Sequence, residues 1–268
     1  MGLDFVTLAM DLSDRTAVVT GAASGLGRAI AARLASHGAA VVVADVLEEP
    51  REGGIPTADL ITQGGGRARF VRTDVRLEEE VAAAVATATE TFGSLDIMCN
   101  NAGVSELLTS VAETSMDDFD RLVSVNFRGQ FIGCKHAARK MIEQGRGGII
   151  VNTASCFGLV GYPTMAVYCS TKGAVVQLTR SLAGELGQHN IRVNALCPGT
   201  IDTEMDRAQR EDAVAGADID SRTPLLLPGG ASACTPDEQA AAVAFMVSDA
   251  ARWMTGACLV MDGGWTAL

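Results

Sequence analysis

Two side chains that could move a proton together, Tyr168 and Lys172, stand four residues apart in the sequence. On a helix this spacing places them one turn apart on the same face. An ammonium held beside a phenol favours the phenolate, so we expect the pKa of Tyr168 to lie below its ordinary value of about 10. The chain contains only two tyrosines and three lysines in 268 residues, which makes chance a weak explanation of the pair.

A glycine-rich turn near the N-terminus could bind a phosphate. The segment reads Thr20-Gly21-Ala22-Ala23-Ser24-Gly25-Leu26-Gly27, between a predicted strand at residues 16–20 and a predicted helix at residues 26–37. Glycines allow backbone N–H groups to approach a pyrophosphate at a helix N-terminus, where the helix dipole favours anions. The spacing Gly21-x-x-x-Gly25-x-Gly27 differs from the general G-x-G-x-x-G fingerprint. A tight turn without a ligand is the alternative, and the flanking strand and helix favour the dinucleotide site.

Asp45 ends the second predicted strand, residues 40–44, where an acidic residue hydrogen-bonds the adenosine ribose in dinucleotide-binding folds. Its carboxylate would bind the ribose hydroxyls of NAD and repel the 2′-phosphate of NADP, by about 1 to 4 kcal/mol at about 4 Å. The next residue is Val46 rather than an arginine, and the glycine turn contains no arginine that could hold that phosphate. The sequence therefore predicts NAD as cofactor, with a turn-capping role for Asp45 as the alternative.

Apolar runs and helical repeats alternate regularly along the chain. Predicted strands cover residues 16–20, 40–44, 69–72, 95–99, 148–152, 192–196 and 257–261, and predicted helices cover 26–37, 58–63, 78–92, 115–143, 168–188 and 236–248. Ser115 is the expected N-cap of the long helix, with Asp118 three residues on. About seven βα units without a linker predict a single α/β domain over residues 1–268, a Rossmann-like, doubly wound parallel sheet with helices on both faces.

Ser155 follows the predicted strand at residues 148–152, at the sheet edge where ligands bind in open α/β folds. Together with Tyr168, Lys172 and the glycine turn, it resembles the short-chain dehydrogenase/reductase family, in its one-domain, tyrosine-dependent branch. The thirteen-residue step from Ser155 to Tyr168 is shared with that family, and the resemblance extends from about Arg15 to Trp265.

The resemblance implies two sets of site residues. The catalytic set is Asn126, Ser155, Tyr168 and Lys172. The cofactor-binding set is Gly21, Ser24, Gly25, Leu26, Gly27, Asp45, Asp74, Val75, Asn101, Tyr168, Lys172, Ile201 and Thr203. In this family Asn126 would mark a helix irregularity that holds a water between Lys172 and solvent. The backbone of Ile201 and the hydroxyl of Thr203 would fix the nicotinamide carboxamide.

The same resemblance implies an NAD-dependent secondary-alcohol dehydrogenase or ketone reductase. The Tyr168 phenolate would remove the hydroxyl proton, Ser155 would position the reacting oxygen, and Lys172 would bind the nicotinamide ribose. Two alternatives stay open. A reductase of 3-oxoacyl thioesters on an acidic carrier protein would require NADPH and a basic pocket mouth. A non-catalytic NAD-binding regulator would require a broken catalytic set.

The substrate itself is not specified by these motifs. Expected pocket residues are Ser105, Cys156, Phe157, Tyr162, Met165, Met205 and Leu225, Leu226 and Leu227. Most are apolar, which favours a cyclic or aromatic alcohol. Residues 204–234 lack strong periodicity and predict a loop, with room for one short helix, that covers the substrate. A permanently packed surface loop is the alternative. The family resemblance also implies a homotetramer in which helices 115–143 and 168–188 pack between subunits.

Composition excludes several other functions. The net charge is −11 and no basic block occurs, so neither nucleic acid nor an anionic membrane is an expected partner. Seven scattered cysteines without a C-x-x-C motif indicate reduced thiols and a cytoplasmic protein, and the N-terminus lacks a signal-peptide pattern. The uncharged stretch 147–171 is interrupted by Pro163 and several glycines, which argues against a transmembrane helix. His37, His136 and His189 are scattered and form no metal-binding pattern.

Overall fold

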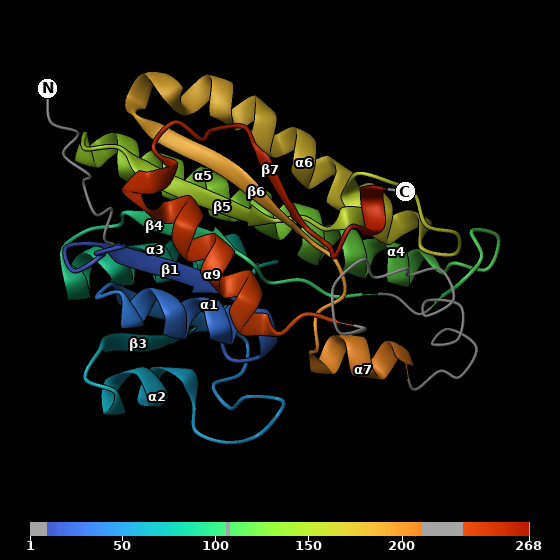
Figure 1. Ribbon diagram of the computed structural model, residues 1–268, viewed down its shortest axis with the longest axis horizontal. Helices are drawn as coiled ribbons and strands as arrows, with labels where there is room; N and C mark the ends of the chain where they lie inside the picture. The colour runs from blue at the N-terminus through green and yellow to red at the C-terminus, as the bar shows by residue number, and fades with distance from the viewer. Residues whose placement is uncertain (1–9, 106–107, 211–232, 268) are drawn as a thin grey trace, which may run out of the picture.

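The computed structural model describes residues 10–105, 108–210 and 233–267, and its centre is a seven-stranded parallel sheet (Figure 1). The strands are β1 (Thr16–Thr20), β2 (Ala40–Asp45), β3 (Arg67–Arg72), β4 (Ile97–Asn100), β5 (Gly148–Thr153), β6 (Ile191–Pro198) and β7 (Cys258–Met261). Their order is β3-β2-β1-β4-β5-β6-β7, which confirms the predicted doubly wound α/β sheet. The winding reverses between β1 and β4, so a crevice is expected at the carboxyl ends of these two strands.

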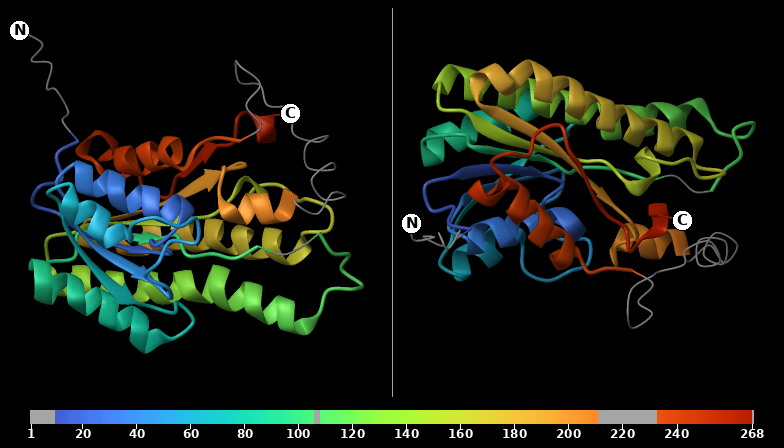
Figure 2. Two further views of the ribbon diagram at one scale, coloured as in Figure 1. Left: turned by 90° about the horizontal axis from the view of Figure 1, so that it is seen from below. Right: turned by 45° about the horizontal axis from the view of Figure 1, so that its top comes forward.

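Helices cover both faces of the sheet (Figures 1 and 2). One face carries α1 (Gly25–Ser36), α2 (Thr57–Gln63) and α9 (Pro236–Val247), and the other carries α3 (Glu78–Phe92), α5 (Gln130–Gln144) and α6 (Ala166–Leu186). The short helices α4 (Met116–Leu122) and α7 (Glu204–Arg210) lie near the end of the sheet at which the strands finish. No helix in the described ranges is long and apolar enough to cross a membrane.

The apolar runs of the sequence form strands because both faces of the sheet are buried. In β2, Val41 and Val43 pack in the cluster that contains α1, whereas Val42 packs in the cluster that contains α3. Side chains alternate between the two faces of a strand, so a strand covered on both sides needs a continuous apolar run. β-branched side chains such as these valines also fit the pleated backbone well.

The helix predicted over residues 115–143 is interrupted in the region of Asn126, where the family resemblance implied an irregularity. Ser115 caps α4 as predicted, since its hydroxyl accepts a hydrogen bond from the backbone of Asp118 at 3.1 Å. The chain then forms a π-helix, η1 (Val123–Gly129), before α5 begins at Gln130. A π-helical turn takes more residues than an α-helical turn and is common at functional sites. The spacing of apolar residues alone does not reveal this break.

Several element boundaries also differ from the prediction. Tyr168 does not open its helix, because α6 begins at Ala166, after Thr164 has turned the chain with a φ of 67°. That helix ends at Leu186, and a 3-10 turn follows where the prediction extended it to residue 188. The segment 204–234, predicted as a loop that could contain one short helix, begins with the short helix α7. Residues 211–232, including the predicted pocket residues 225–227, lie outside the described residues.

Candidate active site

The glycine turn joins β1 to α1 and is fastened to the end of β4. The backbone N–H of Asn101 donates to Thr20 Oγ1 at 3.0 Å, and its side-chain amide donates to Thr20 O at 3.0 Å. Gly27 must lack a side chain, because a Cβ there would lie 2.0 Å from Gly21 O. This packing brings the N-terminus of α1 to the carboxyl edge of the sheet, where free N–H groups can bind an anion.

A carboxylate already contacts the N-terminus of α1. Glu52 Oε1 accepts a hydrogen bond from the backbone N–H of Gly25 at 3.0 Å. Beside it, the backbone N–H of Arg51 donates to Ser24 Oγ at 2.8 Å. The helix dipole and the unpaired N–H groups of a first turn stabilise such an anion. Nothing in the sequence pointed to this contact, since Glu52 lies 27 residues from Gly25 in the chain.

Two aspartates predicted to bind the cofactor lie at the ends of β2 and β3. Asp45 Oδ2 accepts a hydrogen bond from Ala23 N at 2.9 Å, which holds the carboxylate beside the glycine turn. Asp74 pairs with the Arg76 guanidinium, with a shortest N–O distance of 2.6 Å. The hydrogen bonds from Arg76 hold the pKa of the Asp74 carboxyl below its ordinary value, and burial opposes this shift only in part.

Asn126 lies within η1 and is completely buried. Its Oδ1 accepts a hydrogen bond from Val104 N at 2.8 Å, and its Nδ2 donates to Val104 O at 2.8 Å. A Cβ on Gly103 would lie 3.3 Å from Asn126 Oδ1 and 3.6 Å from Lys172 Nζ. The side chains of Asn126 and Lys172 therefore both lie close to Gly103. Val75 supports the same region, because a Cβ on Gly129 of η1 would lie 2.8 Å from its side chain.

Lys172 points from α6 toward the centre of the molecule and is only 3% exposed. Its Nζ donates to Thr153 O at 2.9 Å and lies 5.6 Å from the centroid of the Tyr168 ring. The Thr153 carbonyl also accepts a hydrogen bond from Gln130 Nε2 at 2.9 Å. Burial lowers the pKa of Lys172 from 10.5 to about 8, because a low-dielectric interior disfavours the ammonium.

Ser155 is also buried and begins the 3-10 turn η2 (Cys156–Gly158). Its Oγ accepts a hydrogen bond from Phe157 N at 3.2 Å. The same hydroxyl donates a long hydrogen bond to Cys156 Sγ at 4.0 Å. Sulfur is a weak acceptor, so a substrate oxygen could readily take its place.

Ile201 and Thr203 lie between β6 and α7, on the opposite side of the site from Asn126. Ile201 forms an isolated parallel bridge with Cys234, which fixes the backbone of this segment. Thr203 Oγ1 accepts a hydrogen bond from Asp206 N at 3.4 Å, at the start of α7. A Cβ on Gly25 would lie 3.3 Å from the Thr203 methyl group, so this segment reaches the glycine turn.

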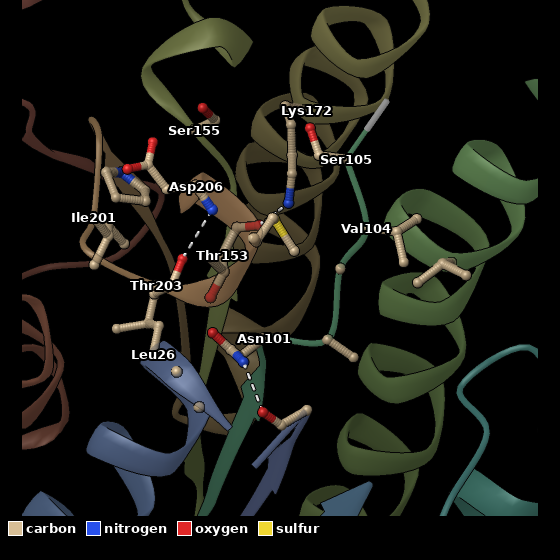
Figure 3. Close-up of a pocket in the computed structure, with 18 of the residues that line it drawn as sticks. Leu26, Asn101, Val104, Ser105, Thr153, Ser155, Lys172, Ile201, Thr203 and Asp206 are labelled. Atoms are coloured by element: carbon tan, nitrogen blue, oxygen red, sulfur yellow. Dashed lines mark hydrogen bonds between the residues drawn. The ribbon is translucent and has the colours of Figure 1, made fainter. Parts of the chain in front are cut away.

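One cavity of about 480 Å³ connects these groups. Its lining includes the predicted residues Gly21, Ser24, Gly25, Leu26, Gly27, Asp45, Asp74, Val75, Asn101, Ser155, Tyr168, Lys172, Ile201 and Thr203. Asn126 is not part of the lining and lies behind Gly103. Figure 3 shows Ile201 and Thr203 on one side of the pocket and Val104 and Ser105 on the other, with Lys172 between them. Among the described residues, no cluster of His, Cys, Asp or Glu could hold a metal ion.

The remaining part of the cavity is the predicted substrate pocket. Six of the residues expected there line it, namely Ser105, Cys156, Phe157, Tyr162, Met165 and Met205. Sequence reasoning missed Trp265, whose ring lies 5.1 Å from that of Phe157 and which lines the same cavity. The signal that could have found it is its place directly after the glycine pair Gly263-Gly264.

Residues 21–266 match the family model described as "Enoyl-(Acyl carrier protein) reductase". The chain belongs to the short-chain dehydrogenase/reductase family. This dehydrogenase/reductase is 42% identical over 259 residues to 2,5-dichloro-2,5-cyclohexadiene-1,4-diol dehydrogenase of Sphingobium indicum, across 96% of the chain and 99% of that protein. It is also 42% identical over 258 residues to cis-4-hydroxycyclohexanecarboxylate dehydrogenase of Sinomonas cyclohexanicum, across 96% of the chain and 98% of that protein. The protein is therefore an oxidoreductase that acts on CH–OH donors, as the motifs implied.

Solved structures of this family superpose closely on the chain. A short-chain type dehydrogenase/reductase from Mycobacterium marinum has a TM-score of 0.88 and 34% identity, over 97% of this chain and 98% of that one. A structure from Beutenbergia cavernae has a TM-score of 0.85 and 35% identity, over 97% of this chain and all 100% of that one. The latter contains bound NADP at low occupancy. A nicotinamide cofactor is thus common to the family, whether as NAD or as NADP.

Proposed function

We propose that this short-chain dehydrogenase/reductase oxidises hydrophobic cyclic secondary alcohols with NAD and reduces the corresponding ketones with NADH. The observation that carries the proposal is the composition of the cavity. The cavity is lined by the N-terminus of α1, by the Lys172–Tyr168 pair and by a largely apolar group of side chains. These are the parts that a hydride transfer between a dinucleotide and an apolar alcohol requires.

The residues present fit a nicotinamide dinucleotide. The Glu52 carboxylate on the Gly25 N–H is a stand-in anion that marks a pyrophosphate position. Asp45 lies beside the glycine turn, within reach of an adenosine ribose, and Thr203 packs against Gly25 of the same turn. A bound cofactor would supply the hydride acceptor at its nicotinamide ring, and the protein supplies orientation and proton control.

The residues of the catalytic set carry out the proton transfer. Tyr168, as the phenolate, takes the proton from the substrate hydroxyl, and Ser155 Oγ donates a hydrogen bond to the substrate oxygen. The buried ammonium of Lys172, 5.6 Å from the Tyr168 ring, favours the phenolate and binds the nicotinamide ribose. Asn126, which like Lys172 lies close to Gly103, supports the route by which the proton leaves toward solvent.

NAD is the proposed physiological coenzyme because Asp45 would face the ribose hydroxyls. Its carboxylate stays beside the glycine turn through the hydrogen bond from Ala23 N, so it would repel a 2′-phosphate placed there. Arg76, an arginine that lines the cavity, is paired with Asp74. NADP in the structure from Beutenbergia cavernae belongs to that protein.

A ring-shaped substrate is favoured by the apolar pocket and by the relatives. Both relatives named above carry a six-membered carbocycle in the substrate of their names. In the chain itself, Phe157, Tyr162 and Met165 provide an apolar surface close to Tyr168. Such a surface would bury the hydrocarbon part of a cyclohexanol-like molecule and leave its hydroxyl at the catalytic set.

The assembly and cellular setting are part of the same proposal. Helices α4 and α5 expose large apolar side chains, among them Met116, Phe119 and Phe131. An exposed apolar face of this kind is suited to packing against another subunit, which supports the expected homotetramer. All seven cysteines are free thiols, which supports a reducing, cytoplasmic environment.

The decisive experiment is coenzyme-linked turnover with a panel of secondary alcohols. Cyclohexanol and substituted cyclohexanols should be oxidised with NAD at a higher kcat/KM than acyclic alcohols, and NADP should be the poorer coenzyme. A 3-oxoacyl thioester with NADPH serves as the comparison substrate. Preference for the thioester would replace the proposal with the carrier-protein reductase. Binding of NADH without turnover of any substrate in the panel would favour a regulatory role.

A further inference from the structure

The substrate end of the cavity is closed by three aromatic rings, those of Phe157, Tyr162 and Trp265, which we call the aromatic wall. Phe157 packs against Tyr162 with ring centroids 4.9 Å apart and meets Trp265 edge-on at 5.1 Å. Phe157 also meets the Tyr168 ring edge-on at 6.5 Å. Aromatic residues make up only 4% of the chain, yet both tyrosines and one of its two tryptophans gather here. The fold therefore concentrates its few rings beside the phenol that handles the proton.

Trp265 is held in this wall by a buried carboxylate. It follows β7 on a turn in which Asp262 Oδ1 accepts a hydrogen bond from Gly264 N at 2.9 Å. Asp262 Oδ2 accepts hydrogen bonds from Thr266 N at 2.8 Å and from Thr266 Oγ1 at 2.6 Å. The Trp265 N–H donates to Asp262 O at 3.2 Å. Bonds to the residues on both sides of Trp265 hold its backbone in place, and its ring packs against the rings of Phe157 and Tyr162.

Of the rings in the aromatic wall, Phe157 is the one next to the Tyr168 phenol, and Trp265 lies behind it. Phe157 contacts both Tyr168 and Trp265, so Trp265 lies one ring further away from the phenol. A small acyclic alcohol bound at Tyr168 would contact Phe157 and stop short of the indole. A substrate that extends into the pocket with a six-membered ring would place the C–H groups of that ring against the aromatic faces, which is a favourable apolar contact.

We propose that Trp265 is a specificity-determining residue that packs against the carbocycle of the substrate and selects cyclic over small acyclic alcohols. Asp262 is a positioning residue, because it acts only through the turn that holds the indole. The inference rests on the proposed function, since it concerns the substrate of the same site. It goes beyond that function because it assigns the preference for cyclic substrates to a single side chain, that of Trp265 in the C-terminal turn.

The test compares two alcohols in two variants. Trp265→Ala should lower kcat/KM for cyclohexanol by about tenfold or more, because a large apolar contact is lost, while kcat/KM for isopropanol changes by less than about threefold. The loss should appear mainly in KM, since the indole does not touch the reacting atoms. Trp265→Phe keeps an aromatic face and should retain most of the preference. Trp253→Phe is the matched control, because Trp253 is 91% exposed and does not line the cavity.

Retained turnover of isopropanol shows that each variant is folded. If Trp265→Ala lowered kcat/KM equally for cyclohexanol and isopropanol, or for neither, the assignment would be overturned. If Trp265→Ala does not fold, Trp265→Leu takes its place, and the same comparison of the two alcohols decides. Asp262→Asn should lower the ratio of kcat/KM for cyclohexanol to that for isopropanol, as Trp265→Ala does, because it loosens the turn that holds the indole. An unchanged preference in that variant would contradict the positioning role.

A binding measurement separates this inference from the proposed function. In Trp253→Phe, Trp265 is the only tryptophan, so its emission reports on the wall. NAD with cyclohexanone is a pair that cannot react, and cyclohexanone should then change the Trp265 emission in a saturable manner, whereas acetone should not. This outcome would support the role of Trp265 even if no alcohol of the panel were turned over. Saturable protection by cyclohexanone against thermal unfolding, without any change in Trp265 emission, would refute it.

Discussion

The Lys172 ammonium lies 5.6 Å from the centroid of the Tyr168 ring, one helical turn along α6. The same ammonium donates to the backbone carbonyl of Thr153, so its position is fixed from two directions. A cation at this distance from an aromatic centroid is attracted by the ring and stabilises a negative charge on its oxygen. The ring and the hydroxyl of Tyr168 therefore have separable roles, the first in holding Lys172 and the second in proton transfer.

Tyr168→Phe should abolish turnover while coenzyme binding survives. The substitution keeps the ring beside Lys172 and removes only the oxygen that would take the proton. We expect kcat to fall by about a hundredfold or more, because general acid–base catalysis contributes about 10² to 10⁴. Steady-state rates with cyclohexanol and NADH titration followed by fluorescence provide the measurement. Tyr162→Phe is the matched control, since it changes the only other tyrosine and should keep turnover of isopropanol. Retention of a tenth of the wild-type rate in Tyr168→Phe would contradict the assignment.

Lys172→Met should stabilise the coenzyme-free protein at neutral pH. Burial lowers the pKa of Lys172 from 10.5 to about 8, so the unfolded chain binds more protons than the folded protein between these values. The free energy of unfolding of the wild type therefore rises as the pH increases from about 8 to 10.5. Below pH 8 the buried Lys172 is charged in the folded protein, and the full penalty applies. The shift corresponds to a penalty on the order of 3 kcal/mol, from about 1.4 kcal/mol per pKa unit.

The measurement is urea unfolding of the wild type and of Lys172→Met at several pH values from 7 to 10. The advantage of the variant should be largest at pH 7 and shrink toward pH 10. Thr153 O keeps a donor in the variant, because Gln130 Nε2 lies 2.9 Å away. The exposed Lys135 offers a control, and Lys135→Met should bring no such gain. A Lys172→Met variant that is less stable than the wild type at pH 7 would show that the ammonium is not under strain.

Asp45→Ala combined with Val46→Arg should narrow or reverse the preference for NAD. The change removes the carboxylate that Ala23 N holds beside the glycine turn and adds a guanidinium that can bind a phosphate in a bidentate manner. The ratio of kcat/KM for NAD to that for NADP should fall by at least about tenfold, given a repulsion of about 1 to 4 kcal/mol. A wild-type enzyme that already uses both coenzymes equally would refute the role given to Asp45.

Glu52→Gln should tighten coenzyme binding. The Glu52 carboxylate contacts the Gly25 N–H, which is the position proposed for the pyrophosphate, so it competes with the cofactor for the start of α1. Removing its charge should lower the Kd for NADH about twofold to fivefold, in line with the modest energy of a charge at a helix terminus. Fluorescence titration measures the change. Glu49→Gln alters an exposed carboxylate in the same segment and should leave the Kd unchanged. A weaker affinity in Glu52→Gln would mean that Glu52 helps to bind the cofactor.

Two glycine substitutions should have opposite effects on stability. In Gly27→Ala the new Cβ would lie 2.0 Å from Gly21 O and 2.5 Å from Asn101 Nδ2, so the glycine turn must shift. We expect a loss of about 1 to 3 kcal/mol, as for other overpacked sites, together with loss of coenzyme binding. Gly184 lies in α6 with nothing within 4 Å of its Cβ position, and Gly184→Ala should stabilise the protein by about 0.5 to 1 kcal/mol. Thermal unfolding with and without NADH compares the two.

Much of the fold was predictable because its determinants are local. The valines of β2 form a continuous apolar run, and only a strand buried on both faces requires such a run. The four-residue step from Tyr168 to Lys172 placed both side chains on one helix face, and the structure shows them together. Apolar spacing did not predict the π-helix; only the family resemblance implied an irregularity at Asn126, whose side chain bonds the backbone of Val104, 22 residues away in the chain.

The sequence by itself determined the order of strands and helices, the glycine turn and the Tyr168–Lys172 pair, because each depends on the spacing of neighbouring residues. Only the tertiary structure decided that Glu52 contacts Gly25, that Gln130 shares the Thr153 carbonyl with Lys172, and that Trp265 packs on Phe157. These contacts join segments that are distant in the sequence, and no local periodicity encodes them. The packing of the sheet and its helices brings them together, and the same packing lowers the pKa of Lys172 by excluding water.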